Sequence, residues 1–351
     1  MQYALPRFVH PTTLLLVVGL LCLQPAQAAL VKIGVFSPEG FATGMQRWQP
    51  SADYLGQQIP AHRFQMLPYQ DLGELEDDAR RGKFDFVLTH PASFVQLEQQ
   101  AGLIRLLTRR HRDGALQHAS AAVVIFTRAD NRIQGLADLA RTPFVTTRAQ
   151  DYSSWQLVQL ELERLGQDPD HALSEVTFAG DSEAVLDGVM SGDYPAGAMA
   201  ARDFDRFLRQ GRISPQAVQI LEASETPGFP FRFSGRLYPQ WPLGVLPDTP
   251  AELRQAVQQS LLALPEGHVA LEAGHYAGWQ PADNYHAVRP LLSKSLSRHV
   301  VERQLSVANL WLEQHRQTLL ITLVFTLLAW LLIRLFAHPR KLAGLKRLST
   351  L

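Results

Sequence analysis

Short apolar runs alternate with amphipathic segments from about residue 30 to residue 290. The short runs are typical of buried strands, and apolar residues that recur every three to four positions are typical of helices. The pattern predicts strands at 30–36, 64–67, 84–88, 121–127, 144–147, 176–179 and 196–201, and helices at 47–58, 71–81, 92–101, 153–165, 181–191, 203–210 and 250–264. This alternation predicts an α/β fold with mostly parallel sheets covered by helices.

The order strand, helix, strand, helix occurs twice, and the chain becomes rich in proline, glycine and aromatic residues after Glu222. The simplest architecture for this order is two α/β lobes joined by chain crossings near residues 120–135 and 220–232. We therefore expect a first lobe from about 29–125 and 226–295, and a second lobe from about 126–225.

The N-terminal segment has the pattern of a secretory signal peptide. Arg7 precedes an apolar run at 14–23, and Ala26-Gln27-Ala28 supplies the small residues that a signal peptidase recognises. Residues 1–28 are therefore predicted to be cleaved. An uncleaved anchor is the alternative, but the run is short against the roughly 20 residues that span a bilayer. The single cysteine, Cys22, lies in this segment, so the mature chain would contain neither disulfides nor catalytic thiols.

A second apolar segment, at 317–337, is long enough to be a transmembrane helix. The tail at 338–351 contains only basic charges, which marks the cytoplasmic side of a membrane. These features predict a single-pass protein of the inner membrane with its large domain in the periplasm. The tail is too short to fold into a kinase or permease domain, so we expect any output to come from another polypeptide.

The juxtamembrane segment at 296–316 is charged and predicted to be helical. Its apolar residues follow a spacing like that of a heptad seam, and they are Val301, Leu305, Ala308 and Leu312. A homodimer through 297–316 is one interpretation of this seam. A helix that packs on the domain above it is the other, because so few repeats do not establish a coiled coil.

Charge and motifs exclude several classes of protein. The 33 Lys and Arg residues equal the 33 Asp and Glu residues in number, so no basic field indicates nucleic-acid binding. No phosphate-binding loop, dinucleotide fingerprint, zinc-protease motif or hydrolase nucleophile motif occurs. His268 and His275 lack an acidic or sulfur partner at ligand spacing, so no metal site is predicted. We therefore expect neither an enzyme nor a cofactor.

Several segments carry a family resemblance that covers nearly all of residues 31–290. The most specific are FDFVLTHP and RLYPQWP, supported by WQPSADYL and GDYPAGAMAARDFDRF. They resemble the periplasmic sensor domains of tetrathionate-sensor-type histidine kinases, which are themselves similar to the phosphate, phosphite and phosphonate binding proteins of ABC transporters. The resemblance implies a type II periplasmic binding fold at 29–295, with a ligand cleft between the lobes.

Two features depart from that family. The sensor-type members continue into a kinase core after the transmembrane helix, which we do not expect here. Ser182 also stands where the transporter-type proteins usually have a histidine, so an identical ligand is not implied.

Ligands of open α/β sheets bind beyond the carboxyl ends of strands, where helix N-termini favour anions. Arginine side chains there could pair with an anion in a bidentate manner. The candidates in these places are Ser37, Phe41, Thr89, His90, Arg148, Tyr152, Ser153, Ser154 and Arg202. Helix capping is the alternative for the hydroxyls, a structural role for His90, and solvation for the arginines. Trp48, Tyr152 and Trp155 could wall the cleft, whereas we assign Trp241 and Trp279 to packing.

The resulting hypothesis is a membrane-anchored periplasmic sensor that binds a small anion, either a phosphorus or sulfur oxyanion or an organic acid. Binding would close the lobes and signal through 297–316 to a separate partner such as a histidine kinase. The alternative is a tethered substrate-binding component of a phosphate/phosphonate-type ABC transporter. An enzyme acting on the bound solute is a distant third possibility.

Overall fold

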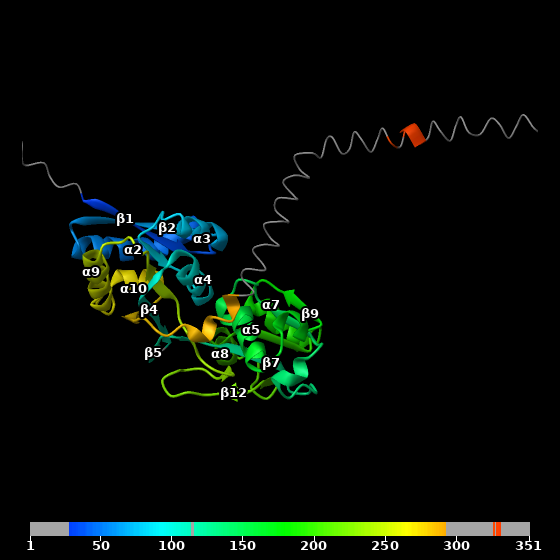
Figure 1. Ribbon diagram of the computed structural model, residues 1–351. Helices are drawn as coiled ribbons and strands as arrows, with labels where there is room; N and C mark the ends of the chain where they lie inside the picture. The colour runs from blue at the N-terminus through cyan, green and yellow to red at the C-terminus, as the bar shows by residue number, and fades with distance from the viewer. Residues whose placement is uncertain (1–27, 114–115, 293–325, 327, 331–351) are drawn as a thin grey trace, which may run out of the picture. The chain divides into compact units, whose positions relative to one another are not determined.

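The computed structural model describes residues 28–113, 116–292, 326 and 328–330 (Figure 1). Contacts divide the chain into one compact unit that ends at Leu292 and a second that begins at Ser293. The predicted signal peptide, juxtamembrane helix and cytoplasmic tail lie outside the described residues, and so does nearly all of the predicted span at 317–337. Within the described residues, no helix is both long and apolar enough to cross a membrane.

The first unit contains two α/β lobes, each with its own sheet (Figure 1). The sheet of the first lobe has the order β16-β4-β15-β3-β1-β2, and β5 pairs with β4. Its strands are β1 (Ala29–Phe36), β2 (His62–Tyr69), β3 (Phe86–Leu88), β4 (Ile104–Asp113), β5 (Leu116–His118), β15 (Pro242–Val245) and β16 (Gly278–Pro281). Strand β1 runs parallel to β2 and β3, whereas β15 is antiparallel to β3 and β4.

Helices cover this sheet because their apolar faces need a partner surface. They are α2 (Phe41–Gln58), α3 (Leu72–Arg80), α4 (Pro91–Ala101), α9 (Ala251–Leu262) and α10 (Val269–Gly274). Trp48 of α2 and Val257 of α9 pack with Phe86 of β3 in one buried cluster. Helix α4 begins with proline at its first turn, where the missing N–H costs nothing. Its N-cap is His90, whose Nδ1 accepts the Ser93 N–H at 3.3 Å.

The second lobe has a five-stranded sheet in the order β11-β7-β10-β8-β9. The strands are β7 (Val123–Arg128), β8 (Pro143–Thr146), β9 (Glu175–Phe178), β10 (Ala196–Ala200) and β11 (Val218–Ile220). The helices are η1 (Leu136–Leu139), the π-helical η2 (Tyr152–Gln156), α5 (Leu157–Arg164), α6 (Pro169–Ala172), α7 (Ser182–Ser191) and α8 (Ala201–Arg209). The last element of the first unit within the described residues is the short 3-10 helix η3 (His286–Val288).

The chain crosses between the lobes at two short paired strands. Strand β6 (Ser120–Ala121) carries the chain out of the first lobe and pairs antiparallel with β14 (Tyr238–Pro239) on the return. Strands β12 (Ala223–Ser224) and β13 (Phe233–Ser234) still belong to the second lobe, because the Ile125 N–H donates to Ser234 Oγ at 2.9 Å. The return crossing therefore lies at β14, later in the chain than the segment 220–232 where we expected it.

Strand β4 has no counterpart among the predicted strands. Its sequence, IRLLTRRHRD, carries too many charges to resemble a buried strand, yet it lies between β15 and β16. Because side chains alternate along a strand, Arg109, His111 and Asp113 project from the same face. All three reach the region between the two lobes, so β4 is the strand that positions the candidate site.

Candidate ligand-binding cleft

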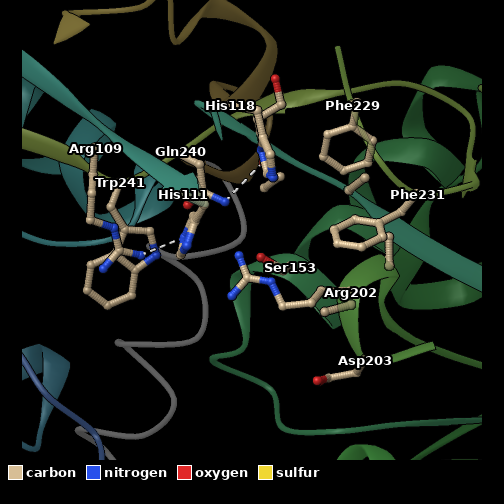
Figure 2. Close-up of a pocket in the computed structure, with 15 residues that line it drawn as sticks. Arg109, His111, His118, Ser153, Arg202, Asp203, Phe229, Phe231, Gln240 and Trp241 are labelled. Atoms are coloured by element: carbon tan, nitrogen blue, oxygen red, sulfur yellow. Dashed lines mark hydrogen bonds between the residues drawn. The ribbon is translucent and has the colours of Figure 1, made fainter. Parts of the chain in front are cut away.

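The first cavity in the cleft has a volume of about 250 Å³ and is lined by both lobes (Figure 2). We call it the arginine cavity. Figure 2 shows Arg109, His111 and Trp241 on one side, Phe229 and Phe231 on the other, and Arg202 between them. The remaining labelled wall residues are His118, Ser153, Asp203 and Gln240.

Arg109 is a buried cation without a carboxylate partner. Only 8% of the residue is exposed, and none of the ion pairs among the described residues involves it. Its guanidinium lies 4.9 Å from the ring centre of Trp241 and 5.8 Å from that of Trp48. Burial, and then the charges of Arg202 and Arg47, lower the pKa of Arg109 to about 9. Arg109 therefore remains charged at neutral pH, and its Nε has no hydrogen-bond partner.

His111 is the neutral neighbour of this cation. Arg109 Nη2 lies 3.0 Å from His111 Nε2, and because a guanidinium can only donate, Nε2 must accept and the proton sits on Nδ1. Burial first, and then the positive charge of Arg109, lower the pKa of His111 well below its ordinary value. The cavity wall thus combines a fixed positive charge with a neutral, orienting imidazole.

Arg202 and Asp113 form an ion pair that bridges the lobes. Arg202 of α8 places Nε 3.0 Å from Asp113 Oδ1, and its Nη2 donates to Oδ2 at 3.1 Å. His118 Nε2 also lies 2.8 Å from Asp113 Oδ2, while its Nδ1 lies 3.0 Å from the Ser120 carbonyl oxygen. The Asp113 carboxylate therefore contacts both the Arg202 guanidinium and the His118 ring.

We expect Asp113→Asn to weaken this bridge in a pH-dependent way. Burial acts to raise the pKa of Asp113, but the hydrogen bond from His118 and the charges of Arg202 and His118 outweigh it and lower the pKa. A lowered native pKa stabilises the fold above the unfolded value of about 3.9, and this stabilisation is lost as pH falls through the native pKa. The variant should lose about 1 kcal/mol of unfolding free energy at pH 7. The loss should be no larger, because Arg202 is partly exposed and solvent weakens the ion pair.

Chemical denaturation of both proteins from pH 3 to pH 8 measures this effect. The difference should shrink as pH falls below about 4, because the Asp113 carboxylate of the unfolded chain is protonated before that of the native protein. Asp130→Asn is the matched control, because Asp130 pairs with Arg128 on the surface of one lobe and should change stability little. A loss for Asp113→Asn that is equally large at pH 3 would contradict the assignment.

A second cavity, of about 190 Å³, adjoins the first. We call it the aromatic cavity because the rings of Phe36, His90, Tyr152 and Trp241 line it. The two cavities share four lining residues, which are Ser153, Ala200, Asp203 and Trp241. They are therefore adjoining parts of one cleft between the lobes.

Two buried polar groups of the aromatic cavity have no partner. His90 Nδ1 accepts a backbone N–H, so the neutral ring carries its proton on Nε2, and that atom is unpartnered. Burial lowers the pKa of His90 to about 4, which keeps the ring neutral at physiological pH. The Oγ1 of Thr147 is also buried and unpartnered. Both groups can donate a hydrogen bond to a ligand.

The structure brings five of the nine predicted site residues to the cleft. His90, Tyr152, Ser153 and Ser154 line the aromatic cavity, and Arg202 and Ser153 line the arginine cavity. The Ser154 hydroxyl is already bound to Thr146 and the Ala198 carbonyl oxygen. Tyr152 donates its hydroxyl to the Pro239 carbonyl oxygen at 3.0 Å.

The other four predicted residues line neither cavity. Ser37 and Thr89 are buried at the ends of strands, and the Ser37 hydroxyl donates to Glu39. Phe41 is 63% exposed at the start of α2. Arg148 is exposed and lies 3.6 Å from Asp151 of its own lobe. Helix-start position alone therefore does not bring a residue into the cleft.

Sequence reasoning missed most of the arginine cavity. Arg109 and His111 lie on β4, which was not predicted, although their alternation with Asp113 could have indicated one face of a strand. Trp241, which we assigned to packing, lines both cavities, and Gln240 precedes it in the motif RLYPQWP. As for metals, no cluster of three or more potential ligands occurs among the described residues.

Known proteins share this architecture. Residues 33–287 match the model of a family described as ABC transporter, phosphonate, periplasmic substrate-binding protein. The chain belongs to this family. Its members are a substrate-binding type of protein and not enzymes, so the chain is a periplasmic solute-binding domain with a mixed α/β fold that resembles type II periplasmic binding proteins.

One curated relative is a sensor kinase. The tetrathionate sensor histidine kinase TtrS of Salmonella typhimurium is 30% identical over 314 residues, which cover 88% of this chain and 51% of the kinase. The chain thus spans about half the length of that curated relative.

Two solved structures share the fold. XAC2383 from Xanthomonas citri, bound to chloride ion, has a TM-score of 0.59 at 20% identity and covers 77% of this chain and 99% of its own. PhnD1 from Prochlorococcus marinus, in complex with methylphosphonate, has a TM-score of 0.54 at 14% identity with the same coverage, 77% and 99%.

Proposed function

We propose that this domain binds a small anion between its lobes and relays occupancy to a separate membrane partner such as a histidine kinase. The observation that carries the proposal is the buried guanidinium of Arg109, which faces the arginine cavity with no carboxylate to neutralise it. A buried, unpaired charge is costly, and an anion in the cavity would offset that cost. The ligand is a phosphorus or sulfur oxyanion or an organic acid.

The Arg202–Asp113 bridge supports a link between occupancy and lobe movement. Arg202 lines the same cavity and belongs to the second lobe, whereas Asp113 belongs to the first. An anion in the cavity would compete with Asp113 for the Arg202 guanidinium, so binding would change an interlobe contact. A ligand can shift an equilibrium between lobe arrangements only through such differential contacts.

The sensor interpretation is supported by the relationship to a tetrathionate sensor histidine kinase. The family model, in contrast, describes transporter components, so a substrate-binding subunit of an ABC transporter is the second candidate. A genomic neighbourhood with a two-component pair favours the sensor, and one with a permease and an ATPase favours the transporter.

A thermal-shift screen of the purified full chain against small anions tests the binding proposal. A ligand present at 100 times its dissociation constant raises the unfolding free energy by about 2.7 kcal/mol. We expect stabilisation by at least one anion among phosphate, phosphonates, sulfate, tetrathionate and carboxylates. Stabilisation by neutral or cationic solutes alone would contradict the proposal.

The membrane anchorage is a proposal that rests on the apolar segment at 317–337 and the basic residues that follow it. We expect reporter fusions after Ser293 to show periplasmic activity and fusions after Leu351 to show cytoplasmic activity. A cytoplasmic signal from the first fusion would contradict the proposed topology.

A further inference from the structure

The aromatic cavity differs chemically from the arginine cavity that it adjoins. The rings of His90 and Tyr152 are stacked with a 5° interplanar angle and a 6.2 Å centroid distance, and Phe36 and Trp241 are stacked at 6.1 Å. Aromatic faces of this kind bind planar or apolar groups through burial of surface. The wall is therefore suited to an organic group.

The charges on this wall disfavour an anionic group. Among the residues that the structure describes, the charged side chains lining the aromatic cavity are Asp151 and Asp203, both acidic. Asp203 accepts hydrogen bonds from Ser182 and Arg206, and Asp151 lies near Arg148. Asp203 also lines the arginine cavity, but Arg109 and Arg202 line it too, so a negative head group would be favoured in that cavity and disfavoured among these rings.

The two unpartnered groups indicate what else the ligand carries. His90 Nε2–H and the Thr147 hydroxyl are both buried, and leaving a buried donor unpaired is costly. Acceptor oxygens on the ligand would satisfy either donor. Because the donors are neutral, a carbonyl, ether or hydroxyl oxygen suits them, and the oxygen need not be charged.

We infer that the aromatic cavity is a second subsite, which takes the uncharged body of an organic anion whose head group lies beside Arg109. The ligand class is then an oxygenated organic anion with a planar or apolar body, and not a bare inorganic oxyanion. The inference rests on the proposed anion binding and deepens it. The two cavities adjoin each other, because Ser153 and Trp241 line both of them.

Isothermal titration calorimetry on the full chain with matched anion pairs tests the second subsite. Each pair keeps the head group and replaces a methyl group by a ring: methylphosphonate with phenylphosphonate, methanesulfonate with benzenesulfonate, and acetate with benzoate. We expect the aryl anion of at least one pair to bind about tenfold more tightly or better, because a buried ring removes apolar surface from water. Equal affinities within every pair would overturn the inference.

Two variants assign the gain to this cavity. Tyr152→Leu should reduce the ratio of the affinity for the aryl anion to the affinity for its small partner. A para-acetyl group on the ring offers an acceptor oxygen to the Thr147 hydroxyl and should raise the affinity further. Thr147→Val should remove this additional gain. It should not lower the unfolding temperature, because the Thr147 hydroxyl has no partner in the protein. Ser93→Ala is the matched control, since its buried hydroxyl is also unpartnered but lines neither cavity.

The outcomes separate the two proposals. An aryl preference that survives unchanged in both Tyr152→Leu and Thr147→Val would overturn the second subsite and leave anion binding intact. Absence of binding by every anion in the wild-type chain would overturn the proposed function, and the second subsite with it.

Discussion

Replacement of Arg109 by glutamine is expected to weaken anion binding by about 30-fold or more. Truncating one member of a buried charge pair costs about 2–5 kcal/mol, and about 1.4 kcal/mol corresponds to a tenfold change in affinity. The loss should be large because the Arg109 side chain is buried between Trp48 and Trp241, where water cannot replace the missing charge. Calorimetry with the anion identified by thermal shift measures the change.

The same substitution should leave the stability of the free protein unchanged or raise it. In the absence of ligand, Arg109 is a desolvated cation without a carboxylate partner, so its removal relieves an electrostatic cost. Arg105→Gln is the matched control, because Arg105 lies on the same strand but pairs with Glu98 at 2.7 Å near the surface. Unchanged affinity in Arg109→Gln, or an equal loss in Arg105→Gln, would show that the anion binds elsewhere.

Replacement of Glu161 by alanine should cause the largest loss of stability, about 3 kcal/mol of unfolding free energy. This carboxylate is fully buried on α5. It accepts a hydrogen bond from the Tyr238 hydroxyl at 2.7 Å and one from Arg164 Nε at 2.8 Å. The variant leaves a buried hydroxyl without its acceptor, and the exposure of about one third of Arg164 places the cost at the lower end of the usual range.

Tyr238 lies on β14, where the chain crosses back to the first lobe, so this contact ties the crossing to the second lobe. Urea denaturation of Glu161→Ala measures the loss, and Tyr238→Phe should show a smaller one. Glu183→Ala, which removes one member of an exposed pair with Arg212, is the control. If Glu161→Ala lost no more stability than Glu183→Ala, the buried network would have no structural importance.

Local sequence patterns predicted seven strands and the longer helices of the two lobes, but not β4, β5 or β11 to β16. Strand β1 has a nearly continuous buried run, and α4 begins at Pro91, one residue before the predicted start, so the physical cause of each element lies within a few residues. Strand β4 was missed because its apolar residues are interrupted by four arginines and a histidine. Pairing with β15 and β16 on either side stabilises β4 as a strand despite these charged residues. Both partner strands come from a distant part of the sequence.

The two arginines in the predicted site have different surroundings in the structure. Arg148 and Arg202 both follow strands of the second lobe and were equivalent as sequence candidates. In the structure, Arg202 reaches Asp113 across the cleft, whereas Arg148 stays in solvent near Asp151. The difference depends on the direction in which α8 presents its first turn to the other lobe, which no local pattern encodes.

The sequence by itself determined the α/β class, the two-lobed organisation and, through FDFVLTHP and RLYPQWP, membership of a periplasmic binding family. These properties follow from periodicity and from motifs that are local in the chain. Only the tertiary structure decided that Arg109 is the buried cation of the cleft, because its surroundings come from Trp48, Arg202 and Trp241. Desolvation and the absence of a counter-charge are set by contacts between residues far apart in sequence, so they become visible only after folding.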